Sequence, residues 1–148
     1  MDPASSSSEQ PVSTILVVDD SATMRMSVEM SLRLSGYRVV IAENGDTALR
    51  LLAEGLRPDL VLTDIVMPGV DGLGLIREAR KLLRFTPIVA LTTQGQRSLR
   101  DEGKAAGATA WLIKPTGGDD LIALVRRFLG EKARHARGPR AQQARRAG

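Results

Sequence analysis

Two hydrophobic patterns alternate along the middle of the chain. Short apolar runs rich in Val, Ile and Leu are typical of strands that are covered on both faces. Segments with apolar residues at helical spacing follow each of these runs. Five strands alternating with five helices predict an α/β fold, a doubly wound five-stranded parallel sheet with helices on both faces. The predicted strands are Thr14–Val18, Arg38–Ala42, Leu60–Thr63, Ile88–Leu91 and Ala110–Ile113.

The helical segments carry their own start and stop signals. The first covers about Ala22–Ser35, and Ser21 is its expected N-cap. The fourth, around Ser98–Ala106, has Leu99 as its only large apolar residue and is interrupted by Gly103, so we expect it to be the most mobile helix. The other helices are expected after Asn44–Gly45, from near Asp71, and around Leu121, Leu124, Val125 and Phe128. The methionines Met24, Met26 and Met30 are expected to be core or packing residues.

Length and composition are those of one globular domain. The chain has 148 residues, of which 43% are hydrophobic and 26% charged, close to the averages for globular proteins. Its apolar runs are far shorter than the roughly 20 residues of a membrane span, and no secretory signal pattern begins the chain. There is no cysteine, and the single histidine, His135, lies in a polar segment, so thiol chemistry and a buried Ser–His–Asp triad are excluded. We therefore expect a cytoplasmic single-domain protein.

The net charge of +4 is concentrated near the C-terminus. Residues 131–148 carry six basic side chains and one acidic one, whereas residues 1–130 carry 15 basic and 16 acidic side chains. Because residues 131–148 lack large apolar side chains, we expect a disordered basic tail there, and a second disordered tail at residues 1–12. The domain then occupies residues 13–130. Two interpretations of the basic tail stay open: a solubilising extension, or an arm that binds nucleic acid or another anionic partner.

Polar side chains follow four of the five predicted strands. The first strand leads into Asp19 and Asp20, the third into Asp64, the fourth into Thr92 and the fifth into Lys114. Because the carboxyl ends of parallel strands meet at one edge, where such folds bind ligands, we expect these side chains to converge. Each residue alone is also explained by a helix cap, a turn or a solvated charge. Their coincidence at one edge favours a common site.

A pocket of this composition predicts a divalent metal and phosphoryl chemistry. Two carboxylates 4 Å apart repel each other by about 4 kcal/mol at an effective dielectric constant of 20. Lys114 offsets one of the three negative charges, and a hard cation with oxygen ligands, such as Mg²⁺, would offset the rest. A carboxylate beside Mg²⁺ can accept a phosphoryl group as a nucleophile, while the metal and the ammonium group align that group and neutralise its charge.

Four segments in the same order resemble the receiver domain of two-component response regulators, particularly the CheY type. The segments are Ile15–Ser21, Asp64–Gly72, Thr86–Thr93 and Gly107–Pro115. The similarity covers about residues 13–130 and is specific, because it involves a set of motifs rather than one. It implies strand order 2-1-3-4-5, the flavodoxin-like order for which CheY is a known example.

The resemblance also implies a role for each residue of the acidic pocket. Asp64 would accept the phosphoryl group from a phosphohistidine of a sensor histidine kinase or a phosphotransfer protein. Asp19 and Asp20 would hold Mg²⁺ together with Asp64 and the backbone carbonyl of Val66. The Lys114–Pro115 peptide bond would be cis.

A conformational switch is the second implication of the resemblance. Thr92 and Lys114 would contact the phosphoryl group, and Thr92 would be coupled to Trp111, which stands where the family usually has Tyr or Phe. Movement of both would reshape the face formed by the fourth helix, the strand Ala110–Ile113 and the fifth helix, where an effector protein binds. The larger ring of Trp111 leaves a second interpretation open, a fixed surface anchor.

A phosphatase and a dinucleotide-binding domain each share part of this pattern, and the sequence disfavours both. A phosphatase of the haloacid dehalogenase type needs a second acid two residues after its nucleophile, but Val66 follows Asp64 and Ser21 follows Asp19 at that spacing. A dinucleotide-binding domain needs a different spacing of glycines than the one at residues 69–74. We predict a monomeric phosphoacceptor protein of chemotaxis or motility signalling rather than an enzyme, with no specific nucleic-acid or membrane partner.

Overall fold

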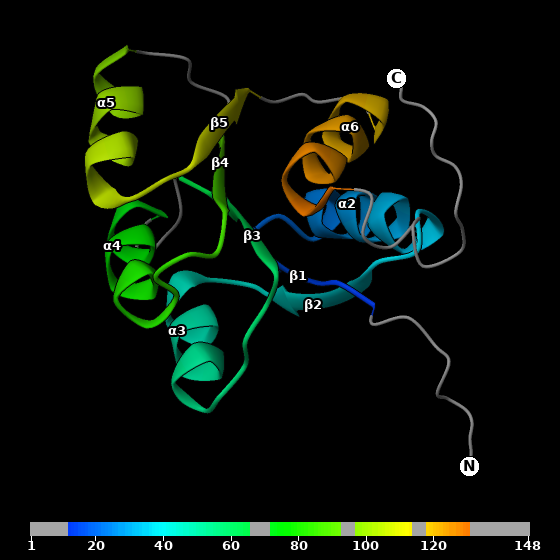
Figure 1. Cartoon of the computed structure of the whole chain (residues 1–148), viewed down its shortest axis with the longest axis horizontal. Helices are drawn as coiled ribbons and strands as arrows, with labels where there is room; N and C mark the ends of the chain where they lie inside the picture. The colour runs from blue at the N-terminus through cyan, green and yellow to red at the C-terminus, as the bar shows by residue number, and fades with distance from the viewer. Residues whose placement is uncertain (1–11, 66–71, 93–96, 114–117, 131–148) are drawn as a thin grey trace.

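Strands and helices alternate along the chain as the hydrophobic pattern predicts (Figure 1). The computed structural model describes residues 12–65, 72–92, 97–113 and 118–130. None of the helices in these ranges is long and apolar enough to cross a membrane. The elements are β1 (Thr14–Val18), α2 (Ala22–Leu34), β2 (Arg38–Ala42), α3 (Gly45–Ala53), β3 (Leu60–Asp64), α4 (Gly72–Leu82), β4 (Ile88–Thr92), α5 (Arg97–Ala106), β5 (Ala110–Ile113) and α6 (Gly118–Leu129).

The five strands form one parallel sheet with the order β2-β1-β3-β4-β5. Helices α3, α4 and α5 lie on one face of this sheet, and α2 and α6 lie on the other (Figure 1). The predicted α/β fold and strand order are therefore confirmed. The strand order reverses between β1 and β3, and ligands bind beside such a reversal in open α/β sheets.

Alternating side chains of the strands build one hydrophobic core on each face of the sheet. In β1, Leu16 and Val18 point towards α3, α4 and α5, whereas Ile15 and Val17 point towards α2 and α6. The edge strand β5 differs from the prediction that every strand is covered on both faces. Its side chains are only partly buried, and Ile113 is 46% exposed, because β5 has a neighbouring strand on one side only.

Helix α2 begins where the sequence predicts but packs differently from one expectation. The Ser21 side chain accepts a hydrogen bond from the N–H of Met24, which confirms Ser21 as the N-cap. The buried residues of α2 are Val28 and Leu32. Met26 and Met30, which lie on the opposite side of the helix, are 65% and 59% exposed. Their predicted place in the core is wrong, because the helical period brings only one stripe of α2 against the sheet.

The guanidinium group of Arg80 connects the end of α4 to the turn between α5 and β5. Its Nη1 donates to the carbonyl oxygens of Leu83 (2.8 Å) and Thr86 (2.7 Å). Its Nη2 and Nε both donate to the carbonyl oxygen of Gly107, at 2.6 Å and 3.1 Å. Burial lowers the pKa of Arg80 from its usual value. Arg80 therefore holds the carboxyl end of α5 in place relative to α4.

The predicted tails fall almost entirely outside the described residues. Residues 1–11 and 131–148 are not among them, so the proposed division at residues 12 and 131 stays a prediction. The expected mobility of α5 also stays a prediction.

We predict that Arg80→Met lowers the free energy of unfolding by about 2 kcal/mol, because several partly buried carbonyl groups lose a charged donor. Urea denaturation measures this change. Arg77→Met is the matched control, because Arg77 is exposed on the same helix, and it should change stability by less than about 0.5 kcal/mol. Equal effects of the two substitutions would contradict the structural role of Arg80.

Candidate metal and phosphoryl-acceptor site

The register of β1 and β3 aligns two aspartates at the carboxyl edge of the sheet. Val18 pairs with Thr63, so Asp19 and Asp64 are the next residues on two neighbouring central strands. A carboxylate oxygen from each of Asp19, Asp20 and Asp64 lies within 4.8 Å of the other two. The structure thus brings together the three acidic residues that the sequence analysis placed at this edge.

Asp19 is held in position by the start of α2. It is 3% exposed, and its Oδ1 accepts a hydrogen bond of 2.9 Å from the N–H of Ser21. Its backbone carbonyl accepts a hydrogen bond of 2.7 Å from Nη1 of Arg25. Asp20 is exposed to solvent. Because α2 begins directly after this pair, the positive end of its dipole offsets part of their charge.

Asp64 ends β3 and is 9% exposed. Its Oδ1 accepts a hydrogen bond of 2.7 Å from the N–H of Ile65. Its backbone carbonyl accepts a hydrogen bond of 2.9 Å from the hydroxyl of the buried Thr63. The first of these hydrogen bonds orients the carboxylate, and the second holds the backbone of the same residue.

Gly72 allows α4 to begin directly against Asp64. Its N–H donates to the carbonyl oxygen of Ile65 at 2.8 Å. A Cβ atom at this position would overlap the carbonyl oxygen of Asp64 and lie 2.5 Å from Cα of Ile65. Only glycine fits here without moving the backbone of the acceptor residue. Sequence reasoning missed this role, because the glycine signals a close approach only once its neighbour in space is known.

Thr92 and Trp111 lie on the same face of the sheet. Thr92 is fully buried at the end of β4, and Trp111 pairs with Ala90 on the neighbouring strand. Since side chains alternate along a strand, Thr92 and Ala90 point to the same side. The indole of Trp111 packs on the core beneath α3, α4 and α5. Trp111 is only partly buried, and the choice between a switch residue and a fixed surface anchor stays a prediction.

Two residues with predicted roles lie outside the described ranges. They are Val66, whose carbonyl was expected to bind the metal, and Lys114, which was expected to contact the phosphoryl group. Their roles and the cis Lys114–Pro115 bond stay predictions.

The residues of the cluster fit a hard divalent cation. All three offer carboxylate oxygens, the donors that Mg²⁺ prefers at ligand distances of about 2.1 Å. Oxygens within 4.8 Å of one another can meet at one ion after small side-chain shifts. A cation bound by Asp19, Asp20 and Asp64 would neutralise charge on these residues and on a phosphoryl group beside them.

A parallel sheet in the order 2-1-3-4-5, with an acidic cluster at the carboxyl edge beside the reversal, defines a CheY-like doubly wound domain. The sequence matches the response regulator receiver domain family over residues 15–126. The chain therefore belongs to this family, and the resemblance seen in the sequence is confirmed.

Solved structures of similar proteins share the whole fold. The chemotaxis response regulator CheY4 of Vibrio cholerae is 36% identical with a TM-score of 0.76, and the match covers 80% of this chain and 99% of CheY4. The receiver domain of a sensor histidine kinase from Pseudomonas aeruginosa is 32% identical with a TM-score of 0.74, covering 81% of this chain and 99% of that domain. The latter was solved with a magnesium ion in its active-site cleft.

A curated relative extends well beyond the shared domain. The response regulator MprA of a Mycobacterium strain (KMS) is 42% identical over 115 residues, which are 78% of this chain and 50% of MprA. This chain thus spans about half the length of that relative.

We predict that Gly72→Ala lowers the free energy of unfolding by about 2 kcal/mol or more, because the added Cβ overlaps the backbone at Asp64. Gly36→Ala serves as the comparison. Gly36 has a φ of 96°, and no atom would lie within 4 Å of an added Cβ. Alanine at this position therefore lowers the free energy of unfolding only because the left-handed conformation is unfavourable for it, by about 1 kcal/mol. Urea denaturation gives both values, and a smaller loss for Gly72→Ala than for Gly36→Ala would contradict the close approach.

Proposed function

We propose that this chain is a phosphorylation-dependent signalling switch whose acceptor is Asp64. The observation that carries this proposal is the cluster of Asp19, Asp20 and Asp64, whose carboxylate oxygens lie within 4.8 Å of one another at the carboxyl edge of the sheet. The donor would be a phosphohistidine of a sensor histidine kinase or a phosphotransfer protein. We place this relay in the cytoplasm and expect the chain to act as a monomer.

The chemistry requires little from the protein beyond position and charge. A carboxylate oxygen of Asp64 attacks the phosphorus atom, the P–N bond to the histidine breaks, and its electron pair stays on the imidazole. Asp19 and Asp20 would hold Mg²⁺, and the bound ion would offset the charge of the phosphoryl oxygens. The hydroxyl of Thr92 and the ammonium group of Lys114 then bind those oxygens. The chain thus acts as a phosphoacceptor rather than as an enzyme on a separate substrate.

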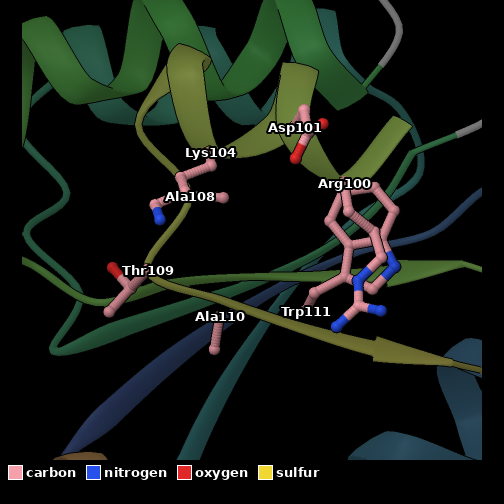
Figure 2. Close-up of a pocket in the computed structure, with 7 residues that line it drawn as sticks. All are labelled: Arg100, Asp101, Lys104, Ala108, Thr109, Ala110 and Trp111. Carbon is pink, nitrogen blue, oxygen red and sulfur yellow. The ribbon is translucent and has the colours of Figure 1, made fainter. Parts of the chain in front are cut away.

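The proposed output is a change on the surface formed by α5, β5 and α6. Thr92 ends the strand next to β5, and Trp111 lies on the same face of the sheet one strand away. Trp111 also lines a pocket of about 600 Å³ between α5 and β5, together with Arg100 and Lys104 (Figure 2). A shift of Thr92 towards a phosphoryl group would leave room for Trp111 to move and would alter the binding of an effector protein there.

We place the chain in a chemotaxis or motility pathway by its likeness to the chemotaxis response regulator CheY4, which is 36% identical. A pathway of the MprA type is the alternative, since that response regulator is 42% identical over 115 residues. No part of the proposal needs specific nucleic-acid binding. The basic residues 131–148 lie outside the described ranges, and binding of an anionic partner by them stays a prediction.

Incubation with acetyl phosphate and Mg²⁺ should add the mass of one phosphoryl group, as measured by intact-protein mass spectrometry. Asp64→Asn should abolish this addition, because an amide oxygen is too weak a nucleophile. Asp46→Asn, at an exposed aspartate of α3, should leave it unchanged. Full phosphorylation of the Asp64→Asn variant would contradict the assignment of the acceptor.

Mg²⁺ binding tests the metal site separately. We predict that Asp20→Asn weakens Mg²⁺ binding, measured by isothermal titration calorimetry, by at least about tenfold. Because Asp20 is exposed and its charge repels those of Asp19 and Asp64, the thermal stability of the metal-free protein should not fall. Unchanged Mg²⁺ affinity in this variant would exclude Asp20 as a ligand.

A further inference from the structure

Gly103 is a buried glycine inside a helix, and the backbone does not explain its presence. Glycine destabilises a helix interior relative to alanine, because it loses more conformational freedom on folding. Gly103 has no left-handed φ that would exclude a side chain, unlike Gly107 at the end of the same helix, whose φ is 119°. The reason for a glycine here must therefore lie in the space around it.

The indole of Trp111 fills that space. A Cβ atom on Gly103 would lie 2.5 Å from Cζ3 of Trp111 and 3.1 Å from Cε3. Real Cβ contacts are not this short, so any other residue at position 103 requires either the helix or the indole to move. Gly103 and Trp111 are thus complementary in size, and the large ring is accommodated by the missing side chain.

The backbone around Gly103 has little freedom to move. Its carbonyl oxygen accepts hydrogen bonds from the N–H groups of Gly107 (3.1 Å) and Ala108 (2.9 Å). The carbonyl oxygen of Gly107 is in turn held by two nitrogen atoms of Arg80. Displacing the end of α5 would disturb these bonds, whereas the indole ring needs only a rotation about its side-chain torsions. We therefore expect the indole of Trp111, rather than the backbone of α5, to move when a side chain is added at position 103.

The inward position of Trp111 depends on packing alone among the described residues. Its Nε1 is buried and has no hydrogen-bond partner in that part of the chain, which is unfavourable for an N–H group that could donate to water outside. The gain that opposes this cost is the contact of the ring with the core and with the backbone of α5. If a side chain fills the space over Gly103, the packing contact is lost while the cost of the buried Nε1 remains, so the outward orientation of the indole becomes more favourable.

We propose that Gly103 is the positioning residue that sets the resting place of Trp111, and with it the shape of the pocket between α5 and β5. Trp111 forms part of the wall of this pocket (Figure 2) and also lines the groove between β5 and α6. A side chain at position 103 drives the indole outward without phosphorylation. The significance of this device for signalling rests on the proposed function, in which the same surface binds the effector.

The chain contains one tryptophan, so its fluorescence reports on Trp111 directly. In Gly103→Ala without Mg²⁺ or a phosphoryl donor, we expect a red-shifted emission and an acrylamide quenching constant about twofold higher than in the unsubstituted protein, as the population moves outward. The control is Ala105→Gly, at an exposed position of the same helix, which changes helix propensity without filling the space beside Trp111. Unchanged emission and quenching in Gly103→Ala overturn the proposal.

A double-variant cycle separates this contact from a general effect on α5. Gly103→Ala should raise Tm when Trp111 is replaced by Leu, because only the gain in helix propensity remains. The same change should raise Tm less, or lower it, when Trp111 is present. If Gly103→Ala prevents folding, the Trp111→Leu substitution should restore it. Equal changes of Tm in both backgrounds, or no restoration, overturn the proposal.

Neither measurement requires phosphorylation, so the two proposals fail separately. If acetyl phosphate and Mg²⁺ do not modify Asp64, the proposed function is wrong, but the fluorescence and Tm comparisons still decide the role of Gly103. If Asp64 is modified and Gly103→Ala leaves Trp111 in place, only the inference about Gly103 is wrong.

Discussion

The parallel sheet holds three mutually repelling carboxylates together at its carboxyl edge, and this charge is the constraint on which the candidate site depends. Asp19 and Asp64 follow paired residues on adjacent central strands, and each is fixed by hydrogen bonds to local backbone groups. They cannot separate without breaking the ends of β1 and β3. Carboxylate oxygens lie within 4.8 Å of one another, and two unit charges at that upper distance repel by about 3.5 kcal/mol at an effective dielectric constant of 20. A bound cation would relieve this repulsion, which is the physical reason why the cluster fits a metal.

The second constraint is that two helices lie so close to neighbouring atoms that only glycine fits at the point of contact. Gly72 lets the first residue of α4 touch the backbone of Asp64, and Gly103 lets the ring of Trp111 lie against α5. Gly103 lies inside α5 and weakens that helix, whereas Gly72 is the first residue of α4. Each glycine permits a contact at a point where the proposed function needs an accurate position: the acceptor in one case and the output surface in the other.

The sequence predicts the elements and the acidic cluster well, because both follow from local rules. Hydrophobic periodicity locates the strands and helices, and the meeting of parallel strand ends places the aspartates together. The strand order came from the resemblance, since apolar runs of similar composition do not reveal their neighbours. The roles of Arg80, Gly72 and Gly103 escaped prediction because each depends on a contact in space that hydrophobic periodicity does not reveal. Met26 and Met30 were misplaced because the pattern of α2 does not show which stripe meets the sheet.

The acidic site and the proposed output surface are joined by a short path through the sheet. Thr92 belongs to the strand beside β3, at the edge where Asp64 lies, and Trp111 belongs to the next strand on the same face. A packed core transmits displacement because it has few voids to absorb one. In the proposed function, a change at Asp64 therefore needs to move only one side chain before it reaches Trp111. The indole Nε1 lacks a hydrogen-bond partner in the described part of the chain, so among these residues packing against the core is what favours its inward position. In the proposal for Gly103, a change in that packing shifts the position of the indole.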